Sequence, residues 1–240
     1  MKHLFKTLIF FFFALAFNIT SAQNVKTYIH PDAVRLMPTV KYEVDKFLPE
    51  LSKPWYFPGL IEHESCISLK HSRCWNAKSR LKNNREEGAG LFQITRAWDT
   101  KGKLRFDNVT YLSKKYVTHL NGLNWNTIYE REDLQIRAGV LLYMEGYNRF
   151  TDLPHNDERI KMADSVFNGG YNHVKVARQR CAILASCNPS IWFNNVELHL
   201  PKSRVPDSRY GGKSMYDINV RHVRDVFDNR MAKFKPYWEN

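Results

Sequence analysis

The segment at 61–65 (IEHES) places a carboxylate where acid–base chemistry can operate. Its apolar flank and the aromatic run at 55–57 predict a helix that ends near Cys66, with Glu64 in the last turn. Apolar surroundings disfavour an ionised carboxylate and raise its pKa, as a general acid at neutral pH requires. Glu64 is therefore the candidate acid, although a solvent-facing helical glutamate is the commoner occurrence.

Two further segments carry groups suited to binding a sugar. Segment 88–93 (GAGLFQ) joins glycines, which let a backbone approach a ligand, to Gln93, which offers both a donor and an acceptor. Segment 166–170 (VFNGG) puts Asn168 at the end of an apolar helix, before two glycines. Each alone is also typical of an ordinary turn or helix end, so the information lies in their order and spacing.

The order is E-S, then G-L-F-Q about 25 residues later, then F-N-G-G about 75 residues after that. In this order the segments resemble the motifs E-S, G-L-M-Q and A-Y-N-A-G of the soluble lytic transglycosylase family. The resemblance covers residues 55–185, including a helix at 134–147. It implies a lysozyme-like fold and an enzyme that cleaves peptidoglycan glycan strands.

The resemblance also implies roles for individual residues. Glu64 matches the family's catalytic glutamate. Substrate binding is implied for the serine after it and for residues of the second and third motifs: Ser65, Gly90, Phe92, Gln93, Phe167 and Asn168.

Two residues depart from the family pattern. Phe92 stands where a methionine is usual, a tolerable apolar exchange. Phe167 replaces the tyrosine whose hydroxyl usually bonds the catalytic glutamate. We expect Tyr143, Tyr171 or Tyr210 to supply that hydroxyl; without one, the acid is held more loosely.

A single acid fits the route that the resemblance implies. Ordinary glycoside hydrolysis uses two carboxylates, and Glu62, two positions from Glu64, faces another side of the helix. Glu64 would protonate the oxygen between N-acetylmuramic acid and N-acetylglucosamine. It would then accept the proton of the muramyl C6 hydroxyl, which closes into a 1,6-anhydro end. No metal and no organic cofactor are needed.

Three other functions stay open. A goose-type, lysozyme-like hydrolase would use water on the same fold. A weakly catalytic wall-binding or scaffold module is favoured by Phe167. A nucleic-acid binder would rest only on the net charge of +12, and the export signal argues against nucleic acid as a partner.

Residues 1–22 have the layout of a secretory signal peptide. Lys2 and Lys6 give a positive start, the apolar run at 7–17 follows, and small residues end at Ala22. The run is too short for a membrane span, which needs about 20 residues. We therefore expect export to the periplasm or cell envelope, with no integral membrane span after signal removal.

Export changes how the cysteines are interpreted. Four cysteines in an oxidising compartment suggest disulfides, with three connectivities open. The pairs Cys66–Cys74 and Cys181–Cys187 are favoured because each closes a short loop. Their spacing does not match a zinc site.

Apolar periodicity predicts one mainly α-helical domain over residues 23–240. The expected helices lie near 40–47, 58–66, 127–147, 157–167, 174–184 and 216–231, with a loop at 75–90 and an irregular stretch at 188–213. A short β-hairpin at 102–111 is compatible with the composition. Residues 188–240 lie beyond the resemblance.

The sequence does not distinguish the physiological role. Wall remodelling and service to a secretion, conjugation or phage lysis apparatus remain equally open.

Overall fold

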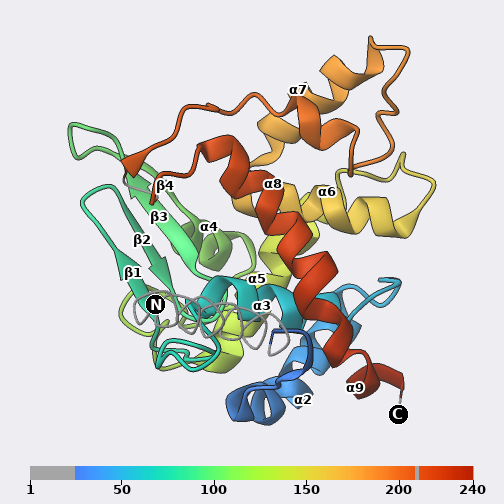
Figure 1. Cartoon of the computed structure of the whole chain (residues 1–240). Coiled ribbons are helices and arrows are strands. Elements are labelled where there is room, and N and C mark those ends of the chain that lie inside the picture. The colour runs from blue at the N-terminus through green and yellow to red at the C-terminus, as the bar shows by residue number, and fades with distance from the viewer. Residues whose placement is uncertain (1–24, 209–210, 240) are drawn as a thin grey trace, which may run out of the picture.

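The computed structural model describes residues 25–208 and 211–239, and about half of them are helical (Figure 1). The predicted signal peptide at 1–22 and Tyr210 lie outside the described residues. None of the described helices is both long enough and apolar enough to cross a lipid bilayer.

The six predicted helices are present with shifted ends. The longer helices are α2 (Pro31–Phe47), α3 (Tyr56–Ser65), α4 (Asn108–Lys115), α5 (Glu132–Tyr147), α6 (Asn156–Gly169), α7 (Tyr171–Ala182) and α8 (Met215–Asp225). Helix α4, which was not predicted, occupies part of the expected hairpin at 102–111. Short helical turns follow at η1 (Val196–His199), η3 (Val226–Arg230), η4 (Met231–Phe234) and α9 (Pro236–Glu239). Local chemistry sets some starts. Ser214 and Asp217 form a reciprocal capping box at the start of α8, which satisfies two otherwise unpaired backbone donors.

The chain also forms a four-stranded antiparallel sheet, so the prediction of a mainly α-helical chain is corrected to a mixed one. Its strands are β1 (Arg80–Lys82), β2 (Glu86–Ala89), β3 (Ile94–Trp98) and β4 (Leu104–Asp107), in the order β1-β2-β3-β4. The loop expected at 75–90 is therefore wrong, and the hairpin expected at 102–111 is instead the pair β3–β4. The strands are short, and β1 and most of β4 are exposed, so no apolar alternation marks them.

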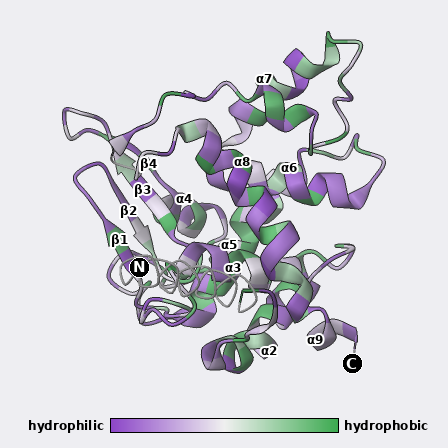
Figure 2. Cartoon of the chain, viewed as in Figure 1, coloured by the Kyte–Doolittle hydropathy of each residue, from purple (hydrophilic) through white to green (hydrophobic). Residues whose placement is uncertain are grey.

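Two hydrophobic clusters meet along α6 and α8. The larger contains side chains of α2, α3 and α5, and the smaller lies among α6, α7 and η1. Helix α6 gives Ala163 to the first and Met162 to the second. Val223 of α8 is in the second cluster, and Val226, just after α8, is in the first. Apolar segments accordingly alternate with polar ones along both helices (Figure 2). Polar side chains at this junction are enclosed from both sides.

Both predicted disulfide pairings are confirmed. The sulfurs are 2.04 Å apart in Cys66–Cys74 and 1.94 Å apart in Cys181–Cys187. The first closes the loop that follows α3. The second ties the end of α7 to the start of the irregular segment after it.

Close packing against α5 fixes the turn between β2 and β3. Gly90 has φ +68°, and a Cβ there would lie 2.0 Å from Oε1 of Gln135, which accepts a hydrogen bond from the Leu91 amide at 3.0 Å. A Cβ on Gly139 of α5 would lie 2.3 Å from the Phe92 ring. The β2–β3 turn and α5 can therefore pack this closely only because Gly90 and Gly139 have no side chains.

We expect Gly139→Ala to lower the free energy of unfolding by about 1–3 kcal/mol, because the added methyl group overlaps the buried Phe92 ring. Gly146→Ala on the same helix is the matched control. Its nearest neighbour is Val166 Cγ1 at 3.1 Å, so the loss should be smaller. Urea unfolding of both variants measures the difference, and equal stabilities would contradict the packing described for Phe92.

Candidate functional site

Glu64 lies at the edge of the larger core. Helix α3 is deeply buried along most of its length, and it ends at Ser65 because Cys66 turns to an extended backbone conformation. The Glu64 side chain retains 16% exposure. The carboxyl group therefore sits beside the core and can still be reached from solvent.

The closest partner of Glu64 is a histidine from the distant helix α8. His222 Nε2 lies 2.7 Å from Glu64 Oε1, and the histidine side chain is only 4% exposed. Glu64 Oε2 has no hydrogen-bond partner among the described residues and keeps contact with solvent. One oxygen is thus held by the protein, and the other is available to a ligand.

The expected tyrosine partner is not found among the described residues. The Tyr143 hydroxyl donates to the Ile160 carbonyl at 2.8 Å instead. Tyr171 packs against Phe150, and Tyr210 lies outside the described residues. The role expected of a hydroxyl therefore falls to an imidazole.

A second carboxylate faces the other side of the same imidazole. His222 Nδ1 lies 3.0 Å from Oδ1 of Asp164, a fully buried residue of α6. The contact has the distance of an ion pair but not the direction of a hydrogen bond, and neither Asp164 oxygen has a hydrogen-bond partner among the described residues. A buried carboxylate of this kind needs a cation beside it. Glu64, His222 and Asp164 form a chain of alternating charge, here called the charge chain.

His222 is the cation of the charge chain. Burial alone would lower its pKa, but the Asp164 and Glu64 carboxylates outweigh burial and raise the pKa of His222 to about 10. The His63 ring lies 4.2 Å away, and its pKa is lowered by burial and by the charge on His222. At neutral pH the positive charge therefore resides on His222.

Glu62 belongs to a different network. It is fully buried, with Lys233 Nζ at 2.7 Å and Arg230 Nη1 at 3.3 Å. Burial raises the pKa of Glu62 although both cations oppose the shift. Because this carboxylate anchors the C-terminal turns to α3, it is not a second acid for a substrate, as the sequence predicted.

Ser65, for which the resemblance implied substrate binding, has its hydroxyl hydrogen-bonded within the protein. It is 1% exposed, its hydroxyl donates to the Ile61 carbonyl at 2.7 Å, and it accepts from the Trp75 amide at 3.1 Å. Ser65 instead joins α3 to the loop closed by Cys66–Cys74.

The three motifs lie together through their aromatic rings. The Phe92 ring centroid is 6.3 Å from Phe57 of α3 and 6.2 Å from Phe167 of α6. Phe92 is 1% exposed and packs against both other rings, whereas Phe167 is only partly buried. Segments separated by more than a hundred residues are thereby fixed around one apolar contact.

The two amide side chains of the motifs differ in how they are used. Gln93 has φ +45°, and its Nε2 donates to the Gly90 carbonyl at 2.7 Å and to Ser79 at 3.2 Å, so its amide stabilises the turn. Asn168 is half-buried, and its Nδ2 is unpaired among the described residues. Asn168 therefore has a donor to offer where Gln93 does not.

Unpaired polar atoms gather where α6 ends and α8 begins. They are the Ser165 hydroxyl, Asn168 Nδ2, Asn219 Oδ1 and the Asp164 carboxylate, all buried and without a hydrogen-bond partner among the described residues. Each such atom costs about 1–3 kcal/mol. In native proteins such atoms are few, so these groups near Asp164 and Asn168 are candidates for contact with solvent or a ligand.

One group of possible metal ligands occurs among the described residues: Cys181, Cys187 and His199. Zinc and copper bind cysteine as a thiolate. Because the two sulfurs are joined in a disulfide, only the imidazole remains to bind a metal.

Comparison with known proteins does not assign the chain to a family. Neither the protein-family models nor the curated proteins contain a match to the chain. The charge chain and the shared aromatic contact are therefore the basis for assigning a function.

We expect the stability of the wild type to fall between pH 6.5 and about 10. The pKa of His222 is raised from 6.5 to about 10 on folding, so its contribution is complete below pH 6.5 and is lost as the imidazolium deprotonates. His222→Gln removes this titration. Urea unfolding across the range should give a shallower decline for the variant, and parallel curves would contradict a cationic His222.

Proposed function

We propose that the protein is a peptidoglycan lytic transglycosylase with a lysozyme-like fold and with Glu64 as its acid and base. The observation that carries the proposal is the position of Glu64, at an accessible helix end, paired with a buried imidazolium. The aromatic contacts among Phe57, Phe92 and Phe167 support it, because they hold the three motif segments against one another.

His222 holds the proton that the first step needs. The charged pair contains one proton between Nε2 and Oε1, which lie 2.7 Å apart. A sugar that excludes water around Glu64 makes the neutral pair more favourable relative to the ion pair. The proton then passes from His222 through Glu64 to the glycosidic oxygen, and His222 is protonated again at the end of the cycle, so Asp164 lacks its counter-charge only while the reaction proceeds.

The reaction conserves atoms and protons. Glu64 gives its proton to the glycosidic oxygen, the bond from that oxygen to C1 breaks, and the muramyl acetamido group stabilises the cation at C1. The Glu64 carboxylate next removes the proton of the C6 hydroxyl, and O6 bonds to C1. The products are a free N-acetylglucosamine hydroxyl and a 1,6-anhydro end, and the proton returns to His222.

A goose-type hydrolase is the alternative on the same residues, with water attacking C1. Mass spectrometry separates the two, since anhydro products are lighter by one water. A binding module without catalysis was favoured by the hydroxyl missing at Phe167. The imidazole beside Glu64 supplies a different partner and weakens that alternative.

Glu64→Gln should abolish release of soluble fragments from purified sacculi, because an amide neither donates the proton nor accepts it back. The amide keeps the size of the side chain, so thermal unfolding should confirm an intact fold. Wild-type fragments should carry anhydro ends. A Gln variant that digests sacculi as fast as the wild type would refute the assignment of Glu64.

His222→Ala should lower turnover by roughly 100-fold, as expected for loss of a positioned proton donor. The control is His155→Gln, at an exposed position before α6. A structural role for His222 would change only the amount of folded enzyme. The proposed role also changes the alkaline limb of the kcat/KM profile, and an unaltered limb would exclude His222 from the proton path.

A further inference from the structure

A cavity of about 440 Å³ lies between the end of α7 and the segment that follows η1. Its polar lining consists of basic side chains, and no acidic side chain lines it. The residues are Arg180, His199, Lys202 and Arg204, together with Leu198, Leu200 and Pro201. We call this cavity the basic pocket.

The lysine and the two arginines of the basic pocket form no ion pair within the described part of the chain. Among the described residues, no carboxylate lies within ion-pair distance of Arg180, Lys202 or Arg204. Arg178, one helical turn or less from Arg180, is by contrast paired with Asp152 at 2.6 Å. Cations collected without counter-charges attract an anion, and the pocket walls concentrate that attraction.

Two of these cations are held in place before any ligand arrives. Arg204 Nη2 donates to the Leu198 carbonyl at 2.9 Å, and its guanidinium lies 3.6 Å from the centre of the Tyr216 ring. Lys202 Nζ donates to the Gly169 carbonyl at 3.1 Å, and burial lowers the pKa of Lys202. An anion would meet oriented donors and would lose little affinity to ordering them.

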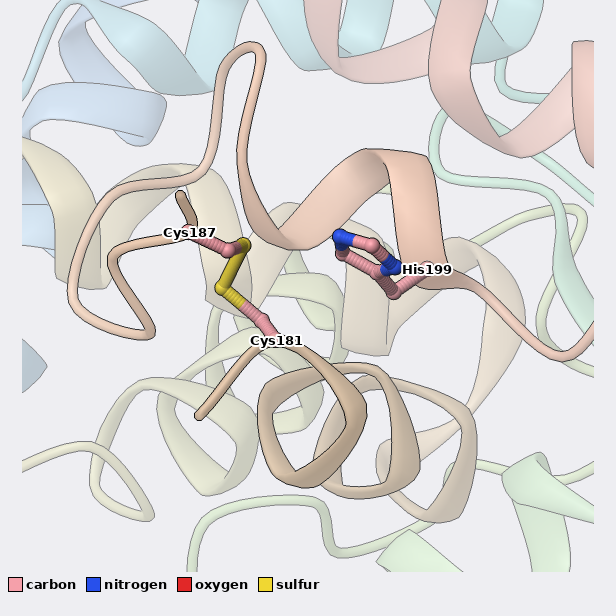
Figure 3. Close-up of side chains that lie close together, drawn as sticks. All are labelled: Cys181, Cys187 and His199. Carbon is pink, nitrogen blue, oxygen red and sulfur yellow. A yellow bond between two sulfur atoms is a disulfide. The ribbon is translucent and has the colours of Figure 1, made fainter. Parts of the chain in front are cut away.

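The disulfide Cys181–Cys187 braces the wall of the pocket. Figure 3 shows the His199 imidazole beside the two sulfurs, and Arg180 precedes Cys181 in α7. The bond ties Cys181, at the end of α7, to Cys187, and both sulfurs lie within 4.8 Å of the His199 imidazole. It therefore restrains the end of α7, where Arg180 lies, on the His199 side of the pocket.

A continuous set of contacts links the basic pocket to Glu64. Lys202 bonds the Gly169 carbonyl, and Asn219 Oδ1 lies 2.2 Å from the point that a Cβ on Gly169 would occupy. Asn219 precedes His222 by three residues on α8, so the two share a helix face. His222 in turn contacts Glu64. Lys202 at the pocket and Glu64 are therefore joined by a short series of contacts across the junction of α6 and α8.

We propose that the basic pocket binds a carboxylate of the peptide stem carried by N-acetylmuramic acid. This inference rests on the proposed function and specifies its substrate as peptide-bearing strands. The sugars next to Glu64 offer mainly neutral hydroxyl and amide groups, whereas the stem peptide carries carboxylates on a flexible branch. Arginine guanidinium groups match carboxylates with paired, charge-assisted hydrogen bonds.

Calorimetric titration of the full mature chain carrying Glu64→Gln tests the pocket without cleavage. The ligands are a disaccharide-tetrapeptide and the same disaccharide without peptide. Adding Arg180→Glu or Arg204→Gln should weaken binding of the peptide-bearing ligand at least about tenfold and leave the peptide-free ligand unchanged. Lys114→Glu, at an exposed position on α4, is the control for a changed net charge.

Each other outcome overturns the inference. Equal affinity for the two disaccharides, or equal weakening of both by the pocket variants, would exclude recognition of the stem. Inorganic phosphate titrated in parallel identifies a general anion site if it competes while the peptide gives no gain. Failure of the proposed function is separate: wild-type protein would then release no fragments from sacculi, whatever the pocket variants do.

Discussion

The buried carboxylate of Asp164 is the constraint on which the site depends. Its side chain is fully buried without a hydrogen-bond partner among the described residues, and an unpaired charge in that position would cost several kcal/mol. The imidazolium of His222 supplies the required counter-charge at 3.0 Å. Because the two residues come from α6 and α8, the packing of these helices also determines which group reaches Glu64.

The position of His222 explains how Glu64 can be held although residue 167 is Phe, where the family that the sequence resembles has tyrosine. The phenylalanine ring packs on Phe92 and keeps the motif segments together, but it offers no hydroxyl to Glu64. The imidazole of His222 enters from α8 instead, at 2.7 Å. A tyrosine would hold the carboxylate as a neutral donor, whereas an imidazolium contributes a charge and a mobile proton. Glu64 is thereby coupled through His222 to the fully buried Asp164.

Helix positions and disulfide pairs could be predicted from the sequence. The sheet could not, and neither could the contacts that His222 and Asp164 make near Glu64. All four strands are short, β1 and most of β4 are exposed, and none shows the apolar alternation by which strands are recognised. Asp164 lies four residues after Ile160 on an apolar stripe, which marks it as an unusual buried acid. Nothing local pairs His222 with Glu64, because 158 residues separate them and only tertiary packing joins them.

Gly169 lies where the packing of α6 against α8 meets the basic pocket. A Cβ at this position would lie 2.2 Å from Asn219 Oδ1, so the helix α8 can approach α6 only because the side chain is absent. That approach carries His222 to Asp164 and Glu64, and the Gly169 carbonyl also holds Lys202 at the rim of the basic pocket. Gly169 therefore sets a spacing, since this one backbone unit lies between α6, α8 and the Lys202 side chain, and the spacing of α6 and α8 determines how His222 meets Asp164 and Glu64.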